Sequence, residues 1–150
     1  LATDINEAVI DIAKTRNLPG NVNFKVADMN SLSADQPFEG LFGGFIWSHI
    51  LLQDLDRFIH GLKGLLHAGG LMAFIDSNYV ENTPHDAKKI SGTDAFGNTY
   101  QTRRLEDGST HRVLKNFPAQ DFLHQKLSGV ATDIRIVNLT YYWIATCRLK

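Results

Sequence analysis

The first half of the chain alternates short apolar runs with amphipathic segments, and this order constrains the fold more than any single motif. Asn6 is a residue type that caps helices, and the segment behind it places apolar residues at helical spacing until the breakers at 17–20. Residues 22–28 then alternate apolar and polar side chains and end on an acidic residue. We therefore predict a helix followed by a strand.

The next segment repeats this order with larger apolar side chains. Residues 44–48 and 71–77 are apolar and predict two buried strands. Between them, residues 55–66 carry one apolar stripe, and the Gly69-Gly70 pair is expected to end that helix. Strands that alternate with helices imply a parallel sheet with crossover connections, so this half is predicted to be α/β.

The second half has the pattern of antiparallel strands. Residues 98–117 form two polar-alternating runs around Asp107-Gly108, a strong hairpin signal. A helix is expected between Pro118 and Gly129. Residues 133–149 then contain two apolar runs separated by almost nothing, and these are expected to pair antiparallel at one edge of the sheet.

Composition limits the classes of partner. The 150 residues are about the size of one domain, and the net charge of −1 disfavours nucleic acid and anionic membranes. Cys147 is the single cysteine and cannot form an internal disulfide, which predicts a protein of the reducing cytoplasm. The lack of a Cys/His cluster predicts that there is no metal site. No apolar run is long enough for a membrane span, and no leader sequence is recognised.

Five stretches, taken in order, carry a resemblance to a known family: "ATDIN", "VADM", "GGFIWSHILLQDLD", "LLHAGGLMAFID" and "DIRIVNLTYYWIATCRL". In this order and spacing the chain resembles a class I S-adenosylmethionine-dependent methyltransferase from its second strand onward. The resemblance implies a Rossmann-like methyltransferase sheet that is mostly parallel, with a C-terminal antiparallel strand pair and an inserted β-hairpin.

The same resemblance implies a first strand and a glycine-rich loop, which do not occur in these residues. They are expected to lie before Leu1, so residues 1–150 are predicted to be one N-terminally incomplete domain. A lid-like insertion is predicted at 79–116.

The resemblance also implies five cofactor-binding residues. Asp4 is expected to accept hydrogen bonds from the ribose hydroxyls, although a carboxylate there can equally cap the following helix. Ile5 would press on the adenine, or belong to the core. Asp28, with the Met29 backbone amide beside it, would bind the adenine edge, or be a solvated loop residue. Ser48 is expected near the transferred methyl, through its backbone carbonyl.

Catalytic and substrate residues are less constrained. His49 lies at the centre of the expected site and is a candidate general base, with a structural histidine as the alternative. Asn78 and Tyr79 are candidate substrate residues because they follow the strand predicted at 71–77, at the active edge. Arg103 is a third candidate, since an arginine can bind a carboxylate or phosphate. Arg103 and Arg104 should point to opposite faces of the hairpin, so at most one faces the site, and a solvated hairpin face is the alternative.

The predicted function is methyl transfer from S-adenosylmethionine to a small-molecule acceptor. An acidic residue at a strand tip also suits a nicotinamide-dependent oxidoreductase. A third hypothesis is a non-catalytic chain that associates through exposed sheet edges, for example as a homodimer.

Overall fold

The computed structural model describes residues 1–81 and 89–150. In this part of the chain, no helix has the length and apolar character needed to cross a membrane. The elements run in the order β1 (Ala2–Asp4), α1 (Glu7–Lys14), β2 (Phe24–Val26), β3 (Phe38–Gly44), η1 (Trp47–His49), α2 (Leu55–Gly61), η2 (Leu62–Gly64), β4 (Leu66–Ser77), β5 (Ile90–Thr93), β6 (Thr99–Arg104), β7 (Thr110–Leu114), α3 (Gln120–Ser128), β8 (Ala131–Asn138) and β9 (Tyr142–Leu149).

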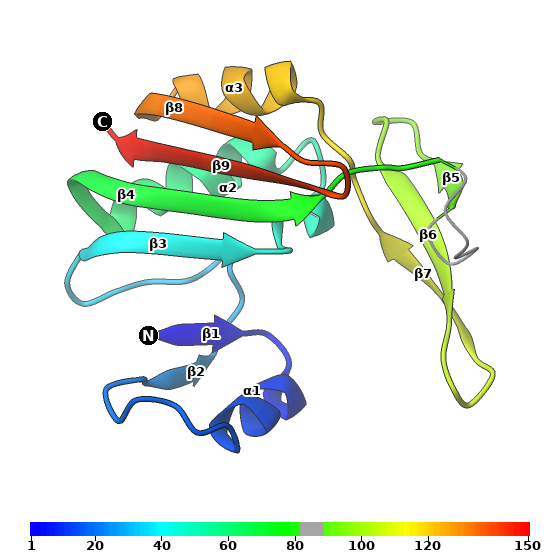
Figure 1. Cartoon of the computed structure of the whole chain (residues 1–150), viewed down its shortest axis with the longest axis horizontal. Coiled ribbons are helices and arrows are strands. Elements are labelled where there is room, and N and C mark those ends of the chain that lie inside the picture. The colour runs from blue at the N-terminus through cyan, green and yellow to red at the C-terminus, as the bar shows by residue number, and fades with distance from the viewer. Residues whose placement is uncertain (82–88) are drawn as a thin grey trace.

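The strands form three sheets (Figure 1): β1-β2, β3-β4-β9-β8 and β5-β6-β7. The α/β class and the antiparallel terminal pair are confirmed, but the prediction of a mostly parallel sheet is wrong. In the four-stranded sheet β3 and β4 are parallel, whereas β4-β9 and β8-β9 are antiparallel. The short link between β8 and β9 forces this direction, because a parallel crossover needs a dozen or more residues.

The β1-α1-β2 unit matches the sequence prediction. β1 and β2 pair in parallel, with Asp4 opposite Val26. The Ala27 amide donates a hydrogen bond to the Asp4 carbonyl at 2.9 Å, a distance typical of a backbone hydrogen bond. The Asn6 side chain accepts a hydrogen bond from the Ala8 amide at 3.0 Å and caps α1. Asp4 is therefore the last residue of β1, and Asp28 follows the carboxyl end of the neighbouring β2.

The strand predicted at 44–48 lies earlier in the chain. β3 ends at Gly44, Phe45 has a φ of 56°, and residues 47–49 form a 3₁₀ turn. The chain therefore turns where an extended strand was expected. The Trp47 ring packs edge-on against Phe74 at 5.3 Å and Trp143 at 5.8 Å. The large apolar side chains that suggested a strand thus belong to a core-facing turn.

The helix predicted at 55–66 is shorter than expected. α2 ends at Gly61, a 3₁₀ turn follows, and β4 begins at Leu66. The glycine pair expected to stop the helix lies inside β4, where Gly69 has a φ of 78°. A left-handed conformation favours glycine, and the pairing with β3 is irregular here, since Phe38 lies opposite Leu66 but Gly40 lies opposite Leu71.

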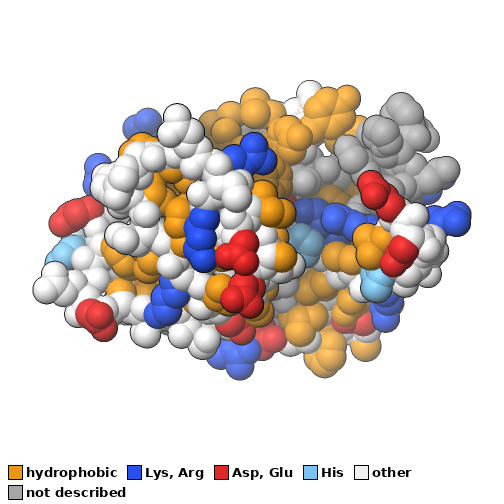
Figure 2. Space-filling model, turned by 90° about the horizontal axis from the view of Figure 1, so that it is seen from below, with side chains coloured by type: hydrophobic (Ala, Val, Ile, Leu, Met, Phe, Trp, Pro, Cys, Tyr) orange, Lys and Arg blue, Asp and Glu red, His pale blue; other side chains and the backbone are white. Residues whose placement is uncertain are grey.

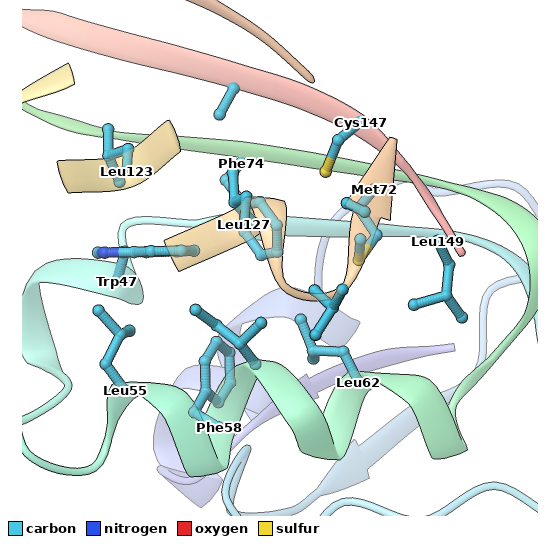
Figure 3. Close-up of a cluster of buried hydrophobic side chains, with 14 of the residues drawn as sticks. Trp47, Leu55, Phe58, Leu62, Met72, Phe74, Leu123, Leu127, Cys147 and Leu149 are labelled. Carbon is cyan, nitrogen blue, oxygen red and sulfur yellow. The ribbon is translucent and has the colours of Figure 1, made fainter. Parts of the chain in front are cut away.

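One apolar core lies between the four-stranded sheet and the helices α2 and α3 (Figure 3). Leu55, Phe58 and Leu62 face the sheet from α2 and its 3₁₀ extension, and Leu123 and Leu127 contribute from α3. Burying a side chain of this size stabilises the fold by about 1.5–3 kcal/mol. Burial also raises the pKa of the Cys147 thiol to about 11, so this cysteine is an unreactive core residue.

The predicted hairpin is confirmed as β6 and β7, with Thr102 opposite Arg112. Gly108 has a φ of 85° in the connecting turn. β5 adds a third antiparallel strand that was not predicted. All three strands fall within the predicted 79–116 insertion, of which residues 82–88 lie outside the described part of the chain.

Candidate functional site

The acidic tips of β1 and β2 lie on the same edge because the strands are parallel and in register. The Asn6 amide donates to Asp4 Oδ1 at 2.8 Å. The Asn30 amide and side-chain nitrogen donate to Asp28 Oδ1 at 2.9 and 3.0 Å. In both carboxylates these local bonds go to one oxygen. The other oxygen, Oδ2, can accept hydrogen bonds from a ligand.

The residues beside these carboxylates differ in exposure. Ile5 is 70% exposed, so it is not a core residue in this structure. Met29 is half-buried and packs against the apolar core, which holds the backbone at the end of β2. An exposed isoleucine next to Asp4 provides an apolar surface at the strand tip.

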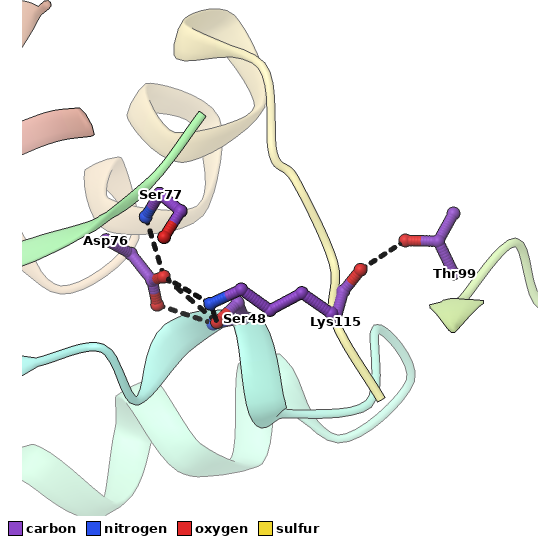
Figure 4. Close-up of polar contacts among 5 residues, drawn as sticks. All are labelled: Ser48, Asp76, Ser77, Thr99 and Lys115. Carbon is purple, nitrogen blue, oxygen red and sulfur yellow. Dashed lines mark hydrogen bonds and ion pairs between the residues drawn. The ribbon is translucent and has the colours of Figure 1, made fainter. Parts of the chain in front are cut away.

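A buried polar cluster occupies the carboxyl end of β4 (Figure 4). Asp76 Oδ1 accepts hydrogen bonds from Lys115 Nζ at 3.0 Å and from Ser48 Oγ at 3.0 Å. Lys115 Nζ also donates to Ser48 Oγ at 2.7 Å, and the Ser48 amide donates to Asp76 Oδ2 at 2.9 Å. The cluster joins the turn after β3, the end of β4 and the segment after β7.

This cluster is removed from water. The Asp76 side chain is 0% exposed and the Lys115 side chain 7% exposed. Removing one partner of such a pair leaves a buried charge without compensation, which costs far more than losing a surface ion pair. Ser48 is itself completely buried, and its carbonyl accepts from the Asn116 amide at 2.8 Å. A ligand at the predicted Ser48 position would share this carbonyl with Asn116.

His49 follows Ser48 and is exposed at the surface. Partial desolvation is the largest cause that lowers the pKa of the imidazole, and the positive charges of Lys115 and, more weakly, Arg103 act in the same direction. A hydrogen bond with the Leu114 backbone and the charge of Asp76 oppose them. The ring is therefore neutral at pH 7, the state in which it can accept a proton.

Asn78 and Tyr79 follow β4 at the same edge. Asn78 Nδ2 donates to the carbonyls of Leu139 at 2.6 Å and Tyr142 at 3.0 Å, so its amide group holds the β8-β9 turn. The Tyr79 ring is 40% exposed and lies 5.3 Å from the Phe117 ring. Asn78 has a structural task in addition to its predicted role, and Tyr79 presents part of its ring to solvent.

The structure separates Arg103 from Arg104, the two adjacent arginines of β6. Arg103 acts electrostatically on His49, and its strand neighbour Gln101, two residues earlier on the same face, is buried. Arg104 lies on the other face of β6. Only Arg103 of this pair is thus directed to the edge that carries His49.

A second polar network attaches the hairpin to the turn after η1. The completely buried Asn98 accepts from the Leu52 amide at 2.7 Å and donates to Gln53 Oε1 at 3.0 Å. Asn116 Nδ2 donates to the Ile50 carbonyl at 2.9 Å and to Asn98 Oδ1 at 3.1 Å. These bonds hold the hairpin beside the turn that follows η1, at the end of the four-stranded sheet where β3 and β4 finish.

The sequence-predicted residues therefore form two groups. Asp4, Ile5, Asp28 and Met29 lie at the ends of β1 and β2, and the tips of β1 and β3 point to the same side of the molecule (Figure 1). The second group lies after β3 and β4 and contains the residues Ser48, His49, Asn78, Tyr79 and Arg103.

Sequence reasoning missed two residues of the second group, Asp76 and Lys115. Asp76 carried one signal, an acidic residue at the end of an apolar strand. Lys115 carried none, since its partner lies 39 residues away in the sequence. No group of three or more metal-ligating side chains occurs within residues 1–81 and 89–150.

The chain resembles known proteins in its fold. No protein-family model matches the sequence, and no curated protein matches it. Among solved structures, DhpI in the "DhpI-SAM-HEP complex" superposes with a TM-score of 0.78 at 21% identity, over 97% of this chain and 66% of DhpI. The chain thus spans about two thirds of the length of DhpI.

Two further structures extend the comparison. A SAM-dependent methyltransferase from Methanosarcina mazei has a TM-score of 0.71 at 17% identity, over 98% of this chain and 80% of its own. The 1,6-didemethyltoxoflavin-N1-methyltransferase of Burkholderia thailandensis has a TM-score of 0.57 at 15% identity, over 99% of this chain and 60% of its own. The chain therefore has the fold of the class I S-adenosylmethionine-dependent methyltransferases.

Proposed function

We propose that this protein transfers a methyl group from S-adenosylmethionine to a small-molecule acceptor. The observation that carries the proposal is the pair of carboxylates, Asp4 and Asp28, at adjacent ends of parallel strands in a fold of this class. Ligands of open α/β sheets bind outside the carboxyl ends of the strands. Solved neighbours support the chemistry: DhpI was crystallised with SAM, and the Burkholderia enzyme with 1,6-didemethyltoxoflavin and S-adenosylhomocysteine.

The residues at the strand ends fit an adenosine. Asp4 accepts from the ribose hydroxyls through the oxygen that Asn6 does not use. Ile5, 70% exposed, covers one face of the adenine. Asp28 accepts from the exocyclic amine, with the Met29 amide beside it, and Ser48 lies toward the methyl group.

The second group of residues, apart from Ser48, serves the acceptor. The bound cofactor supplies an electrophilic methyl group, and the protein mainly aligns the acceptor with it. The acceptor oxygen or nitrogen forms a bond to the methyl carbon while the carbon–sulfur bond breaks, and its proton passes to the neutral His49 imidazole. Tyr79 and Arg103 contact the acceptor, and Asn78 does so through its carbonyl oxygen. Residues 89–116 of the predicted insertion cover it as a lid.

Calorimetric titration of S-adenosylmethionine into the protein expressed from its complete gene tests the cofactor assignment. Asp4→Ala is expected to weaken binding about 10-fold or more, because a hydrogen bond to a charged group contributes about 1.5–3 kcal/mol. Asp11→Ala is the matched control, since Asp11 is an exposed carboxylate on α1 that pairs with Lys14. The control should bind as the wild type does.

Two outcomes contradict the proposal. The absence of binding to the wild type overturns it, as does equal binding by the Asp4→Ala variant and the wild type. A parallel thermal-shift measurement with NAD separates the oxidoreductase hypothesis, because stabilisation by NAD and none by S-adenosylmethionine would favour that chemistry instead.

A further inference from the structure

The inner face of the hairpin brings one arginine to the edge of the sheet that carries His49. Along β6, Gln101 and Arg103 share a face because alternate residues of a strand point the same way. Gln101 is only 3% exposed, so this face of β6 is covered at Gln101. Arg103 is one step further toward the hairpin tip, opposite His111 of β7, and is exposed.

The charges near His49 do not cancel. Lys115 is paired with Asp76 at 3.0 Å, so its positive charge is compensated inside the protein. Arg103 also acts on the His49 ring as a positive charge, and no carboxylate among the described residues pairs with it. Among the residues that the structure describes, the uncompensated positive charge that acts on His49 is the Arg103 guanidinium.

The surface at this place is hollowed. Figure 2 shows a recess between the main body and the hairpin, with a His side chain in it and Lys or Arg side chains beside that His. Acidic side chains lie further out on both sides of the recess. A small molecule entering it would meet the basic groups together.

We propose that the acceptor carries an oxyanion, a carboxylate or phosphate group, which Arg103 binds next to His49. This inference rests on the proposed function and deepens it, because it names the chemical class of the acceptor. A guanidinium offers planar, paired donors that match the two oxygens of a carboxylate or phosphate. The anion would anchor the acceptor within reach of the histidine that takes its proton.

The test follows the NMR signal of the His49 ring during titration with inorganic phosphate and, separately, with acetate. The signal is identified by its loss in His49→Gln. Ionic strength is kept constant with chloride, so that screening does not change along the titration. The wild type is expected to give a saturable shift with at least one of the two anions.

Arg103→Gln and Arg104→Gln form a matched pair, since the two residues are adjacent and lie on opposite faces of β6. Arg103→Gln should weaken anion binding about 10-fold or more, whereas Arg104→Gln should leave it unchanged. The proposal is overturned if the wild type shows no saturable shift, or if the two variants lose the same affinity.

Calorimetry with S-adenosylmethionine on the same variants separates this inference from the proposed function. Arg103→Gln is expected to keep the wild-type affinity for the cofactor. Anion binding that depends on Arg103, in a protein that does not bind S-adenosylmethionine, would overturn the proposed function and leave the oxyanion site. Cofactor binding without an Arg103-dependent anion response would overturn the oxyanion site and leave the proposed function.

Discussion

The Asp76–Lys115 pair is the residue-scale feature on which the second half of the site depends. Both charges are buried, and Ser48 lies within hydrogen-bond distance of both. A buried ion pair adds little net stability compared with an apolar pair, but breaking it is costly. The pair holds the backbone next to His49, so its loss should lower the free energy of unfolding.

Lys115→Met should lower the free energy of unfolding by about 3–5 kcal/mol, because it leaves Asp76 buried without its counter-charge. Urea unfolding measures this change. Lys126→Met is the control: Lys126 pairs with Asp56 at 2.8 Å, but the Asp56 side chain is 64% exposed, so the loss should stay below about 1 kcal/mol. Similar small losses in both variants would contradict the role given to Lys115.

The His49 ring should titrate with a midpoint below 6.5, since desolvation and the charges of Lys115 and Arg103 lower its pKa. Removing a positive charge favours the imidazolium, so Arg103→Gln should move the midpoint up. NMR titration in the absence of multivalent anions measures both. Because only the neutral ring accepts a proton, methyl transfer should decline as the pH falls through this midpoint. A wild-type midpoint above 6.5 would refute the assignment.

At the scale of elements, close packing sets how near β3 comes to the core. Gly43 lies in β3 opposite Phe74 of β4, and a Cβ at Gly43 would come within 2.7 Å of the Phe74 ring and 2.8 Å of Ile46 Cδ1. The strand can approach the core only because this residue has no side chain. The chain then turns at Phe45, whose positive φ ends the extended conformation.

Gly43→Ala should therefore destabilise the protein by about 1–3 kcal/mol through overpacking. Gly61→Ala should instead stabilise it by about 0.5–1 kcal/mol, because Gly61 is the last residue of α2 and a Cβ there meets nothing within 4 Å. The two midpoints of urea unfolding should move in opposite directions. Movement in the same direction would contradict this account of β3.

On the scale of the whole molecule, the hairpin is attached to the sheet by buried amides. Asn98 and Asn116 connect it to the backbone of Ile50 and Leu52. Each buried donor or acceptor that loses its partner costs about 1–3 kcal/mol. The hairpin and the turn that carries His49 are therefore expected to open together.

Asn116→Ala should accelerate amide hydrogen exchange at Leu52 in the turn and at Thr99 in the hairpin, since both amides depend on the network that Asn116 completes. Ser109→Ala is the control, because the Ser109 hydroxyl bonds only within the hairpin tip, to Asp107 and His111. That variant should change exchange at the tip alone. Faster exchange confined to Thr99 in the Asn116→Ala variant would show that the two parts open separately.

Local patterns in the sequence determined the α/β class, the helix behind Asn6, the hairpin around Asp107-Gly108 and the two acidic strand ends. Each of these depends on neighbours a few residues apart: a cap, a turn, or a period of apolar residues. The residue numbers of the candidate cofactor site followed from the same patterns together with the family resemblance.

Tertiary structure alone decided the end of β3, the length of α2, the position of β9 between β4 and β8, and the Asp76–Lys115 pair. These features depend on contacts between residues far apart in the chain, such as Asp76 and Lys115, which are separated by 39 positions. Local periodicity contains no information on which distant side chain will compensate a buried charge or fill the space beside a glycine. Packing and desolvation make that choice when the sheet and helices assemble.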